Sequence, residues 1–500
     1  MASPGGVGHD TPLRLNDLDP SGPELPTSGR ECSTRNLVLA LRSFTLAPKR
    51  LDSGQAESHL AEPPTGLVRT IGRWSLAALM VNTMVGASIF GLPALIAARL
   101  GRLSPVGFFL AFATIAVIAA CMAEVASQFQ ETGGPYLYAR VAFGRFVAIQ
   151  NGWLTWLTRI AAVSAVANLF ITYLAEFFPA ATTPFTRVAI LTALIGFLAA
   201  VNYCGVGGGK QLSNIFTVSK VCLLAFFVIC GLLALTFHPD IRVHATSTAA
   251  TYADWFEALL LMIYSYGGFE AALIASGETR NARKDIPFAL FVSIGATTLL
   301  YIAVQYLVIH TIPDAGRSTA PVVDSARGFL PYWAVRIVAA GTLVSAYGYL
   351  SANVLHTPRV TFAMGERGDF PAFFGSIHPR FRTPHVSIMI FAVLLWIFSI
   401  AGDFRWNALL SSVARLFVYG SVAAALPVLR KKNPLADAFR LPCGRVFSGL
   451  ALAFCAVLIT RMHRQEFLVI AVTTGLACLN WLWARKGAES DYWIRPGNVP

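Results

Sequence analysis

The chain has 500 residues, of which 55% are hydrophobic and only 13% are charged, and its formal net charge is +13. A soluble globular protein carries about 25% charged residues, so this composition excludes an ordinary soluble domain and favours a protein whose surface meets lipid. Lys and Arg lie mainly in short connections between apolar runs, which is typical of membrane topology and argues against binding to nucleic acid.

Residues 1–70 differ in composition from the rest of the chain. They are rich in Gly, Pro, Ser and charged residues and contain no long apolar run, which predicts a disordered tail. No apolar stretch of the kind found in a secretory signal follows Met1, so we expect the tail to stay in the cytoplasm.

From Trp74 onward, apolar runs of about 17–25 residues recur, which is the length that an α-helix needs to cross a bilayer. They predict an all-α integral membrane protein with about twelve transmembrane helices. The runs lie near residues 74–99, 105–128, 146–177, 187–203, 214–236, 255–277, 287–310, 333–362, 385–401, 406–429, 446–461 and 466–484.

The basic residues of the connections predict the orientation of these helices. With the amino-terminal tail in the cytoplasm, the inside connections carry more Lys and Arg than the outside ones. We therefore expect a multi-pass protein of the cell membrane with both termini cytoplasmic. The expected domains are a tail at 1–70, a transporter-like helical core at 71–430, a helix pair at 431–487 and a second tail at 488–500.

The first and sixth runs contain residues that interrupt a helix. The first includes Gly86, Gly91 and Pro93, and the sixth includes Gly267 and Gly268, directly before the carboxylate of Glu270. Glycine weakens a helix, and proline removes a backbone N–H group and clashes with the preceding turn. Both interruptions fall in the middle of a predicted span.

Broken backbone inside a membrane is tolerated only where it is buried or lines a cavity. Matching breaks five helices apart predict an inverted five-helix repeat with a binding site near the middle of the membrane. Free N–H groups suit a carboxylate and free C=O groups suit an ammonium, so an α-amino acid would fit both. For either segment alone, the alternative is that the glycines only permit close helix packing.

At these residues the chain resembles the amino acid–polyamine–organocation superfamily of transporters, which has the LeuT-like fold. Four motifs that are similar to those of the family follow one another in the same order between about Arg73 and Arg430. The first is similar to G-S-G-I-F, with Ala87 and Ser88 departing from the usual pair, and the second to the GGPY loop. The third is similar to the family's sixth helix and its exit, with Ala282 in place of proline, and the fourth to the end of its eighth helix. They lie at Gly86–Phe90, Glu131–Tyr138, Tyr266–Pro287 and Arg359–Met364.

The resemblance implies a secondary amino acid transporter in which helices 1–5 and 6–10 form inverted repeats and helices 11–12 are an addition. Its partners would be a small amino acid, protons and the lipid bilayer, with no cofactor, no metal and no enzymatic activity. Tyr264 would be an aromatic gate. The implied substrate-binding residues are Gly86, Ala87, Ser88, Ile89, Phe90, Tyr264, Ser265, Tyr266, Gly267 and Gly268.

Ionisable residues inside predicted spans are functional candidates. In proton-coupled members of the superfamily, a lysine at the position of Lys220 stands where a sodium ion sits in sodium-coupled relatives, so the resemblance implies proton coupling; a lysine reaching out to the cytoplasm is the alternative. Glu270 would stabilise the second break or share protons. Arg159 and Arg415 would pair with Glu270, or one of them would face the cavity and select an acidic substrate.

Three other functions remain open from the sequence. The first is an amino acid exchanger on the same fold, and the second is a nutrient sensor that binds without translocating. The third is a polyamine carrier, which needs acidic residues in its cavity, and apart from Glu270 the predicted spans contain few. The sequence does not name the amino acid.

Overall fold

The computed structural model describes residues 71–86, 88–129, 133–205, 209–243, 249–274, 279–432 and 438–485. In these ranges the chain is all-helical, and the only β-type pairing is an isolated parallel bridge between Ile71 and Thr279. The predicted tails at 1–70 and 488–500 lie outside the described residues, as does Ala87.

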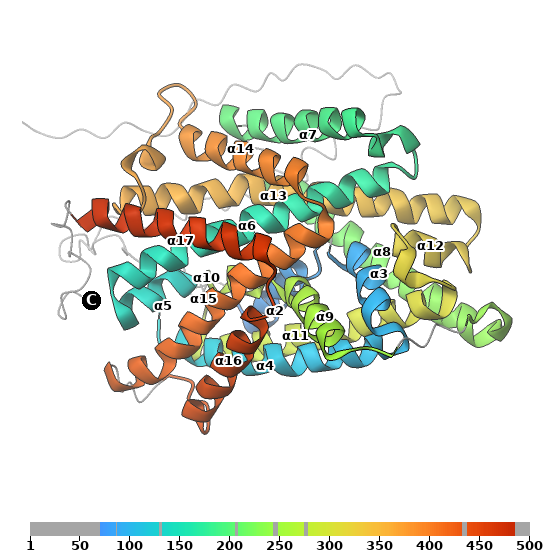
Figure 1. Cartoon of the computed structure of the whole chain (residues 1–500), viewed down its shortest axis with the longest axis horizontal. Coiled ribbons are helices and arrows are strands. Elements are labelled where there is room, and N and C mark those ends of the chain that lie inside the picture. The colour runs from blue at the N-terminus through green and yellow to red at the C-terminus, as the bar shows by residue number, and fades with distance from the viewer. Residues whose placement is uncertain are drawn as a thin grey trace, which may run out of the picture. The chain divides into compact units, whose positions relative to one another are not determined.

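The α-helices follow one another in the chain order that Figure 1 labels. They are α2 (Arg73–Met84), α3 (Ser88–Leu100), α4 (Ser104–Ser127), α5 (Gly134–Phe143), α6 (Arg145–Leu174), α7 (Pro184–Cys204), α8 (Gly209–Phe237), α9 (Tyr252–Tyr266), α10 (Phe269–Ile274), α11 (Ala282–Thr311), α12 (Pro321–Arg327), α13 (Tyr332–Glu366), α14 (His385–Ala401), α15 (Phe404–Lys432), α16 (Gly444–Ile459) and α17 (Arg464–Ala484).

Eight segments of the described chain are long and apolar enough to cross a membrane, which agrees with an integral membrane protein. The apolar helices α14 and α16 are shorter, with 17 and 16 residues. The predicted number of about twelve is larger than eight for two reasons. The first and sixth runs are each divided between two helices, and α14 and α16 are shorter than the eight long segments. The sequence pattern also left out α5 and α12, which have 10 and 7 residues and are too short to span a bilayer.

The first and sixth runs are interrupted where the glycines predicted it. Helix α2 ends at Met84 and α3 begins at Ser88, while α9 ends at Tyr266 and α10 begins at Phe269. Gly268 has φ +127°, a conformation that favours glycine, and a β-carbon there would lie 2.5 Å from the carbonyl oxygen of Thr83. The two breaks therefore meet each other closely.

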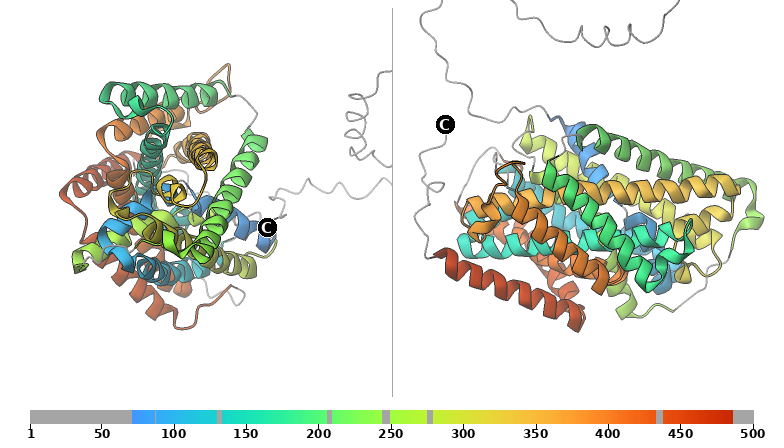
Figure 2. Two further views of the ribbon diagram at one scale, coloured as in Figure 1. Left: turned by 90° about the vertical axis from the view of Figure 1, so that its right-hand side faces the viewer. Right: turned by 90° about the horizontal axis from the view of Figure 1, so that it is seen from above.

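Helices five predicted spans apart pack together. The broken pair α2–α3 contacts the broken pair α9–α10, α4 contacts α11, α6 contacts α13, and α7 contacts α14. Figures 1 and 2 show the last of these pairs, α7 and α14, side by side at the margin of the bundle. Helix α15 packs against α6 in the interior.

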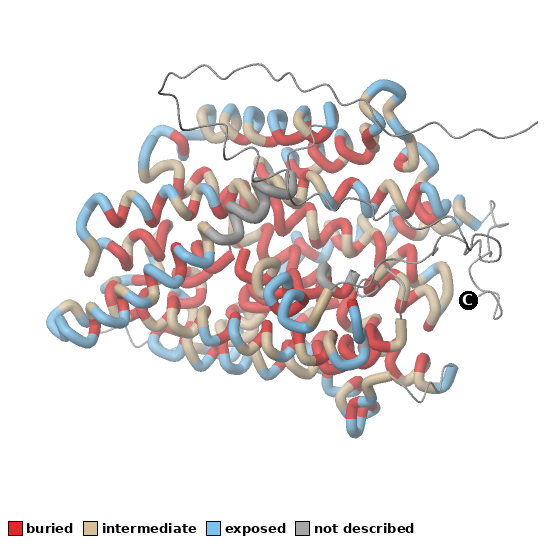
Figure 3. The backbone as a smooth tube through the Cα atoms, turned by 180° about the vertical axis from the view of Figure 1, so that it is seen from behind, coloured by how far each residue is buried: buried red, intermediate tan, exposed pale blue. Residues whose placement is uncertain are grey.

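Burial separates inner helices from outer ones. Most residues in the spans of α6 and α15 are buried, whereas fewer than a third are buried in the spans of α7, α8 and α17. Figure 3 shows buried residues throughout the middle of the bundle and exposed ones along its margins. Their exposed side chains are largely apolar, for example Phe197, Ile229 and Leu479. An apolar outer surface of this extent is typical of contact with lipid.

Candidate functional site

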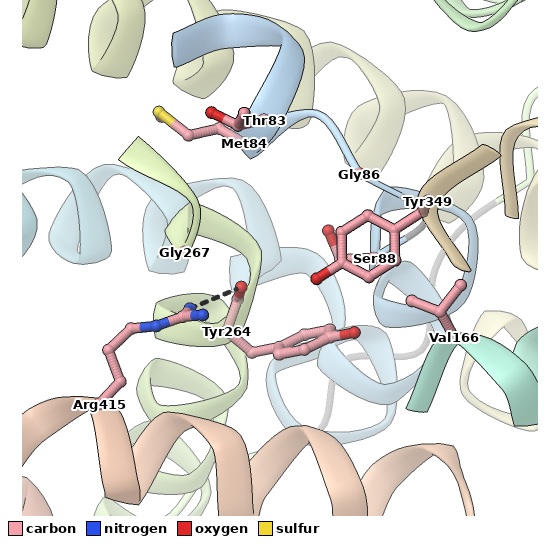
Figure 4. A pocket seen from close by; sticks show the side chains of 9 residues that line it. All are labelled: Thr83, Met84, Gly86, Ser88, Val166, Tyr264, Gly267, Tyr349 and Arg415. Carbon is pink, nitrogen blue, oxygen red and sulfur yellow. Dashed lines mark hydrogen bonds between the residues drawn. The ribbon is translucent and has the colours of Figure 1, made fainter. Parts of the chain in front are cut away.

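A small cavity lies where the two helix breaks meet. Its free volume is about 10 Å³, which is about the space that one water molecule needs. Apart from the two broken helix pairs, three helices, α6, α13 and α15, each contribute one residue to its lining. Its lining residues, labelled in Figure 4, are Thr83, Met84, Gly86, Ser88, Val166, Tyr264, Gly267, Tyr349 and Arg415.

At each break, a cationic side chain lies against backbone carbonyls near the end of the first half-helix. Lys220 Nζ of α8 donates to the carbonyl of Asn82, in the last turn of α2, over 2.5 Å. Arg415 Nη1 of α15 lies 3.3 Å from the carbonyls of Ile263 and Tyr264, near the end of α9. Cations at helix carboxyl ends are favourable because they oppose the helix dipole.

Tyr301 of α11 links the two breaks. Its hydroxyl lies 2.8 Å from the carbonyl oxygen of Met84 in α2 and 3.0 Å from that of Ser265 in α9. A tyrosine hydroxyl has one hydrogen to donate, so it serves one of these two acceptors at a time. The ends of α2 and α9 therefore share a buried donor.

Glu270 is the anion of the site and is shared by two arginines. Its Oε1 lies 3.4 Å from Arg415 Nε and 3.8 Å from Arg159 Nη2. Its Oε2 accepts from Gly268 N over 2.8 Å and from the Tyr419 hydroxyl over 3.2 Å. This bears out the sequence-based pairing of Glu270 with the deep arginines, since a buried charge is stable only when it is paired and hydrogen-bonded.

Gly267 makes room for Arg415. A β-carbon at Gly267 would lie 1.3 Å from Arg415 Nη1, so the guanidinium occupies the space that a side chain would fill. Figure 4 shows Arg415 reaching from α15 past Gly267, with its hydrogen bond to the Tyr264 carbonyl dashed. The same arginine thus lines the cavity and pairs with Glu270.

The structure brings four of the ten sequence-predicted binding residues to the cavity: Gly86, Ser88, Tyr264 and Gly267. Ala87 lies outside the described residues. The other five are buried beside the cavity and do not line it: Ile89, Phe90, Ser265, Tyr266 and Gly268.

Tyr266 and Phe90 have partners that explain their orientation. The Tyr266 hydroxyl points away from the cavity, to Thr298 of α11 over 2.9 Å and to the carbonyl of Phe108 over 3.3 Å. The Phe90 ring packs against Tyr173, whose hydroxyl donates to the Phe90 carbonyl. Alternation of faces along a helix turns such neighbours away from the cavity.

Sequence reasoning missed part of the lining. Thr83 and Met84 precede the first break, while Val166 and Tyr349 come from α6 and α13. Thr83 and Met84 lie next to Gly86 in sequence, so the break itself was a signal for them. An apolar residue such as Val166 inside a hydrophobic run carries no such signal.

Ion pairs link helices beyond both ends of the cavity. At one end, Arg99 at the end of α3 pairs with Asp254 and Glu257 of α9 over 3.3 and 3.0 Å, and Arg405 of α15 also pairs with Glu257. We call this the α3–α9–α15 cluster. The groups hold together helices that converge on the cavity.

At the other end, the buried carboxylate of Asp369, just after α13, pairs with two arginines. Arg140 Nη1 and Arg145 Nε lie 2.5 and 2.7 Å from it, and Tyr136 also bonds to it. We call this the Asp369 cluster. It joins α5 and α6 to the segment that follows α13.

The chemistry of the cavity suits a small polar ligand. Among the described residues, no group of three or more His, Cys, Asp or Glu side chains is arranged to hold a metal ion. Hydroxyls, backbone groups at helix ends and a guanidinium are available to bind a ligand with both carboxylate and ammonium groups.

Comparison with known proteins agrees with this geometry. Residues 71–478 match the family model described as amino acid permease. The chain is 28% identical to the methylthioribose transporter of Bacillus subtilis, over 84% of this chain and 94% of that protein. It is 26% identical to the branched-chain amino acid permease of the same organism, over 79% of this chain and 88% of that protein.

A third relative is an animal protein. The chain is 26% identical to cationic amino acid transporter 4 of Mus musculus, over 73% of this chain and 60% of that protein. The family match and these relatives indicate a transporter and not an enzyme. The match of the family model to most of the chain means that this protein belongs to the amino acid permease family.

Proposed function

We propose that the protein is a secondary active amino acid transporter that couples uptake to protons by alternating access around the cavity between the helix breaks. The observation that carries the proton coupling is the contact between Lys220 Nζ and the Asn82 carbonyl. The lysine ammonium donates to a backbone carbonyl at the first break, and the resemblance implies that a sodium ion takes its place in sodium-coupled relatives. An amine in such a position can exchange a proton as the cavity opens and closes to water.

The proposed architecture is twelve spans, with helices 1–5 and 6–10 as inverted repeats in a core at 71–430 and two added helices at 431–487. It is supported by the equivalent breaks at α2–α3 and α9–α10 and by the packing of helices five spans apart. An inverted repeat with its axis in the membrane plane brings such equivalent helices together. We also propose the cell membrane as the location, with both termini cytoplasmic.

The proposed substrate site is the unwound backbone of the two breaks. Ser88 at the start of α3 offers its N–H group to the substrate carboxylate. Gly86, whose own N–H donates to the Met84 carbonyl, lines the first break, and Tyr264 and Gly267 line the second. Tyr264 acts as the aromatic gate. The neighbouring predicted residues Ile89, Phe90, Ser265, Tyr266 and Gly268 support the backbone of the breaks, and Ala87, outside the described residues, stays a predicted substrate contact. Glu270 keeps the second break together.

Alternating access then requires the two ionic clusters to separate in turn. The α3–α9–α15 cluster lies at one end of the cavity and the Asp369 cluster at the other. A substrate or proton that binds the two conformations with different affinity shifts the balance between them, which is how coupling arises.

The test is uptake of a labelled amino acid mixture into proteoliposomes, with and without an inward proton gradient. We expect the gradient to stimulate uptake, and Lys220→Ala to remove that stimulation. Lys431→Ala, at an exposed position near the end of α15, is the matched control and is expected to behave as the native protein. Gradient-independent uptake that is also unchanged in Lys220→Ala would refute proton coupling.

Two other outcomes identify the alternatives. Uptake that requires amino acid preloaded inside the vesicle marks an exchanger. Binding without any flux, measured as thermal stabilisation by the same mixture, marks a sensor. The printed names of the relatives cover methylthioribose, branched-chain and cationic amino acids, so the family leaves the substrate class open.

A further inference from the structure

The guanidinium of Arg415 is loosely held at the cavity wall. The residue is 4% exposed and lines the cavity, and its Nε faces Glu270 Oε1 at 3.4 Å, in an ion pair too long for a good hydrogen bond. Its two contacts through Nη1 are 3.3 Å long, at the weak end for N–H···O bonds. Buried polar groups are nearly always well satisfied, so a guanidinium with contacts this long beside a cavity can accept a further partner from a ligand.

The charges around Arg415 do not balance. Arg415 and Arg159 approach the same oxygen of Glu270, at 3.4 and 3.8 Å, so two positive charges share one negative charge. The second oxygen of Glu270 already accepts from Gly268 N and Tyr419. An excess positive charge buried inside a membrane protein is unfavourable unless an anion offsets it.

The excess charge lies where a substrate would bind. Of the two arginines that share Glu270, Arg415 is the one that lines the cavity. Lys220, at the carbonyl end of α2, adds a further positive charge close to the same breaks. A cationic ligand would therefore bring its charge beside these groups and be repelled, which is a strong basis for discrimination.

We propose that the substrate is an amino acid with net negative charge, whose additional carboxylate binds the Arg415 guanidinium. This rests on the proposed transport function and names its substrate class. The α-groups occupy the backbone of the breaks, and the second carboxylate accepts from Arg415, whose planar group suits bidentate carboxylate binding.

The competing role for Arg415 is purely structural. In that case it caps the carbonyl end of α9 and pairs with Glu270, while a zwitterionic substrate binds without touching it. The two roles predict different substrate preferences. Glutamate and glutamine make the decisive pair because they have nearly the same shape and differ in charge.

The experiment measures uptake of labelled glutamate, glutamine, leucine and lysine by the full-length protein in proteoliposomes under one proton gradient. We expect glutamate uptake at least tenfold above glutamine uptake, and none for lysine. Arg415→Gln is expected to lower glutamate uptake more than tenfold and to abolish the preference over glutamine. Arg317→Gln, at a site 89% exposed, is the control and should change neither.

A second measurement needs no variant, so that misfolding of Arg415→Gln does not leave the question open. Glutamate should raise the unfolding temperature of the purified native protein at concentrations where glutamine does not. Equal uptake of leucine or glutamine, or any uptake of lysine, would overturn the charge preference while leaving transport intact. An absence of flux for every amino acid would overturn the proposed transport function and the substrate class with it.

Discussion

Gly267 and Arg415 fit together with no spare room: the guanidinium nitrogen Nη1 lies where a β-carbon on Gly267 would stand, at a separation of 1.3 Å. The glycine at the second break therefore has two consequences. It weakens the helix between α9 and α10, and it admits an arginine from α15 to the cavity wall. The break and the charge at the site depend on each other.

Gly267→Ala is expected to displace the guanidinium and to reduce transport more than tenfold, because a methyl group and Nη1 cannot share one place. Gly295→Ala is the matched control, since Gly295 also lies in a membrane helix, α11, and a β-carbon there would meet nothing within 4 Å. The measurement compares the initial uptake rates of the two variants with that of the native protein at equal protein level. Full activity in Gly267→Ala would contradict the packing.

Glu270→Gln leaves the buried Arg415 and the partly exposed Arg159 without a counter-charge and is expected to destabilise the protein. Removing one partner of a buried ionic group costs about 3–5 kcal/mol. The unfolding temperature of the purified protein in detergent should therefore fall clearly. Adding Arg415→Met to Glu270→Gln should recover part of the loss, because it removes one of the two unpaired charges. No recovery in the double variant would show that the charges are not the cause.

Glu124 is buried and forms an ion pair with the partly exposed Arg430. Arg430 Nε and Nη2 each lie 2.6 Å from a Glu124 oxygen, and Leu441 N donates to the same carboxylate over 2.9 Å. The group joins α4 and α15 to the segment before α16, and Glu124→Gln should cost about 1–3 kcal/mol of stability, the range for disturbing the partners of a buried acceptor.

The exposed pair of Arg317 and Asp314 gives the comparison for Glu124. These side chains are 89% and 57% exposed and 3.1 Å apart. Asp314→Asn should change stability by no more than about 1 kcal/mol because exposed ion pairs contribute little. Thermal unfolding of both variants in one detergent measures the difference. Equal losses would mean that burial of the Glu124 carboxylate is not what matters.

Charge balance predicts the response to voltage. If a substrate of net charge −1 moves with one proton, no net charge crosses the membrane, so uptake depends on the pH gradient and not on the membrane potential. A neutral substrate moving with one proton would carry one charge, worth about 2.3 kcal/mol per 100 mV. The measurement that distinguishes these two cases is glutamate uptake into proteoliposomes that have a potassium diffusion potential and no pH gradient. A strong response to the potential would contradict this stoichiometry.

The sequence by itself determined the class of protein and the two helix breaks. Long apolar runs with few charges leave no choice but membrane helices, because unpaired backbone groups are not tolerated in lipid. The glycines Gly86, Gly267 and Gly268 weaken a helix wherever they stand in it, and the structure has its two breaks at these positions. The resemblance carried by four ordered motifs agrees with the family that the chain belongs to.

Only the tertiary structure decided which side chains reach the cavity. The lining brings together side chains from five helices that are far apart in the sequence: Ser88, Val166, Tyr264, Tyr349 and Arg415. The orientation of a residue around a helix decides whether it lines the cavity, so Tyr264 lines it while Tyr266 turns to Thr298. Charge in an apolar run marked Arg415 as unusual, but its place against Gly267 follows from the packing of α15, which no local pattern encodes.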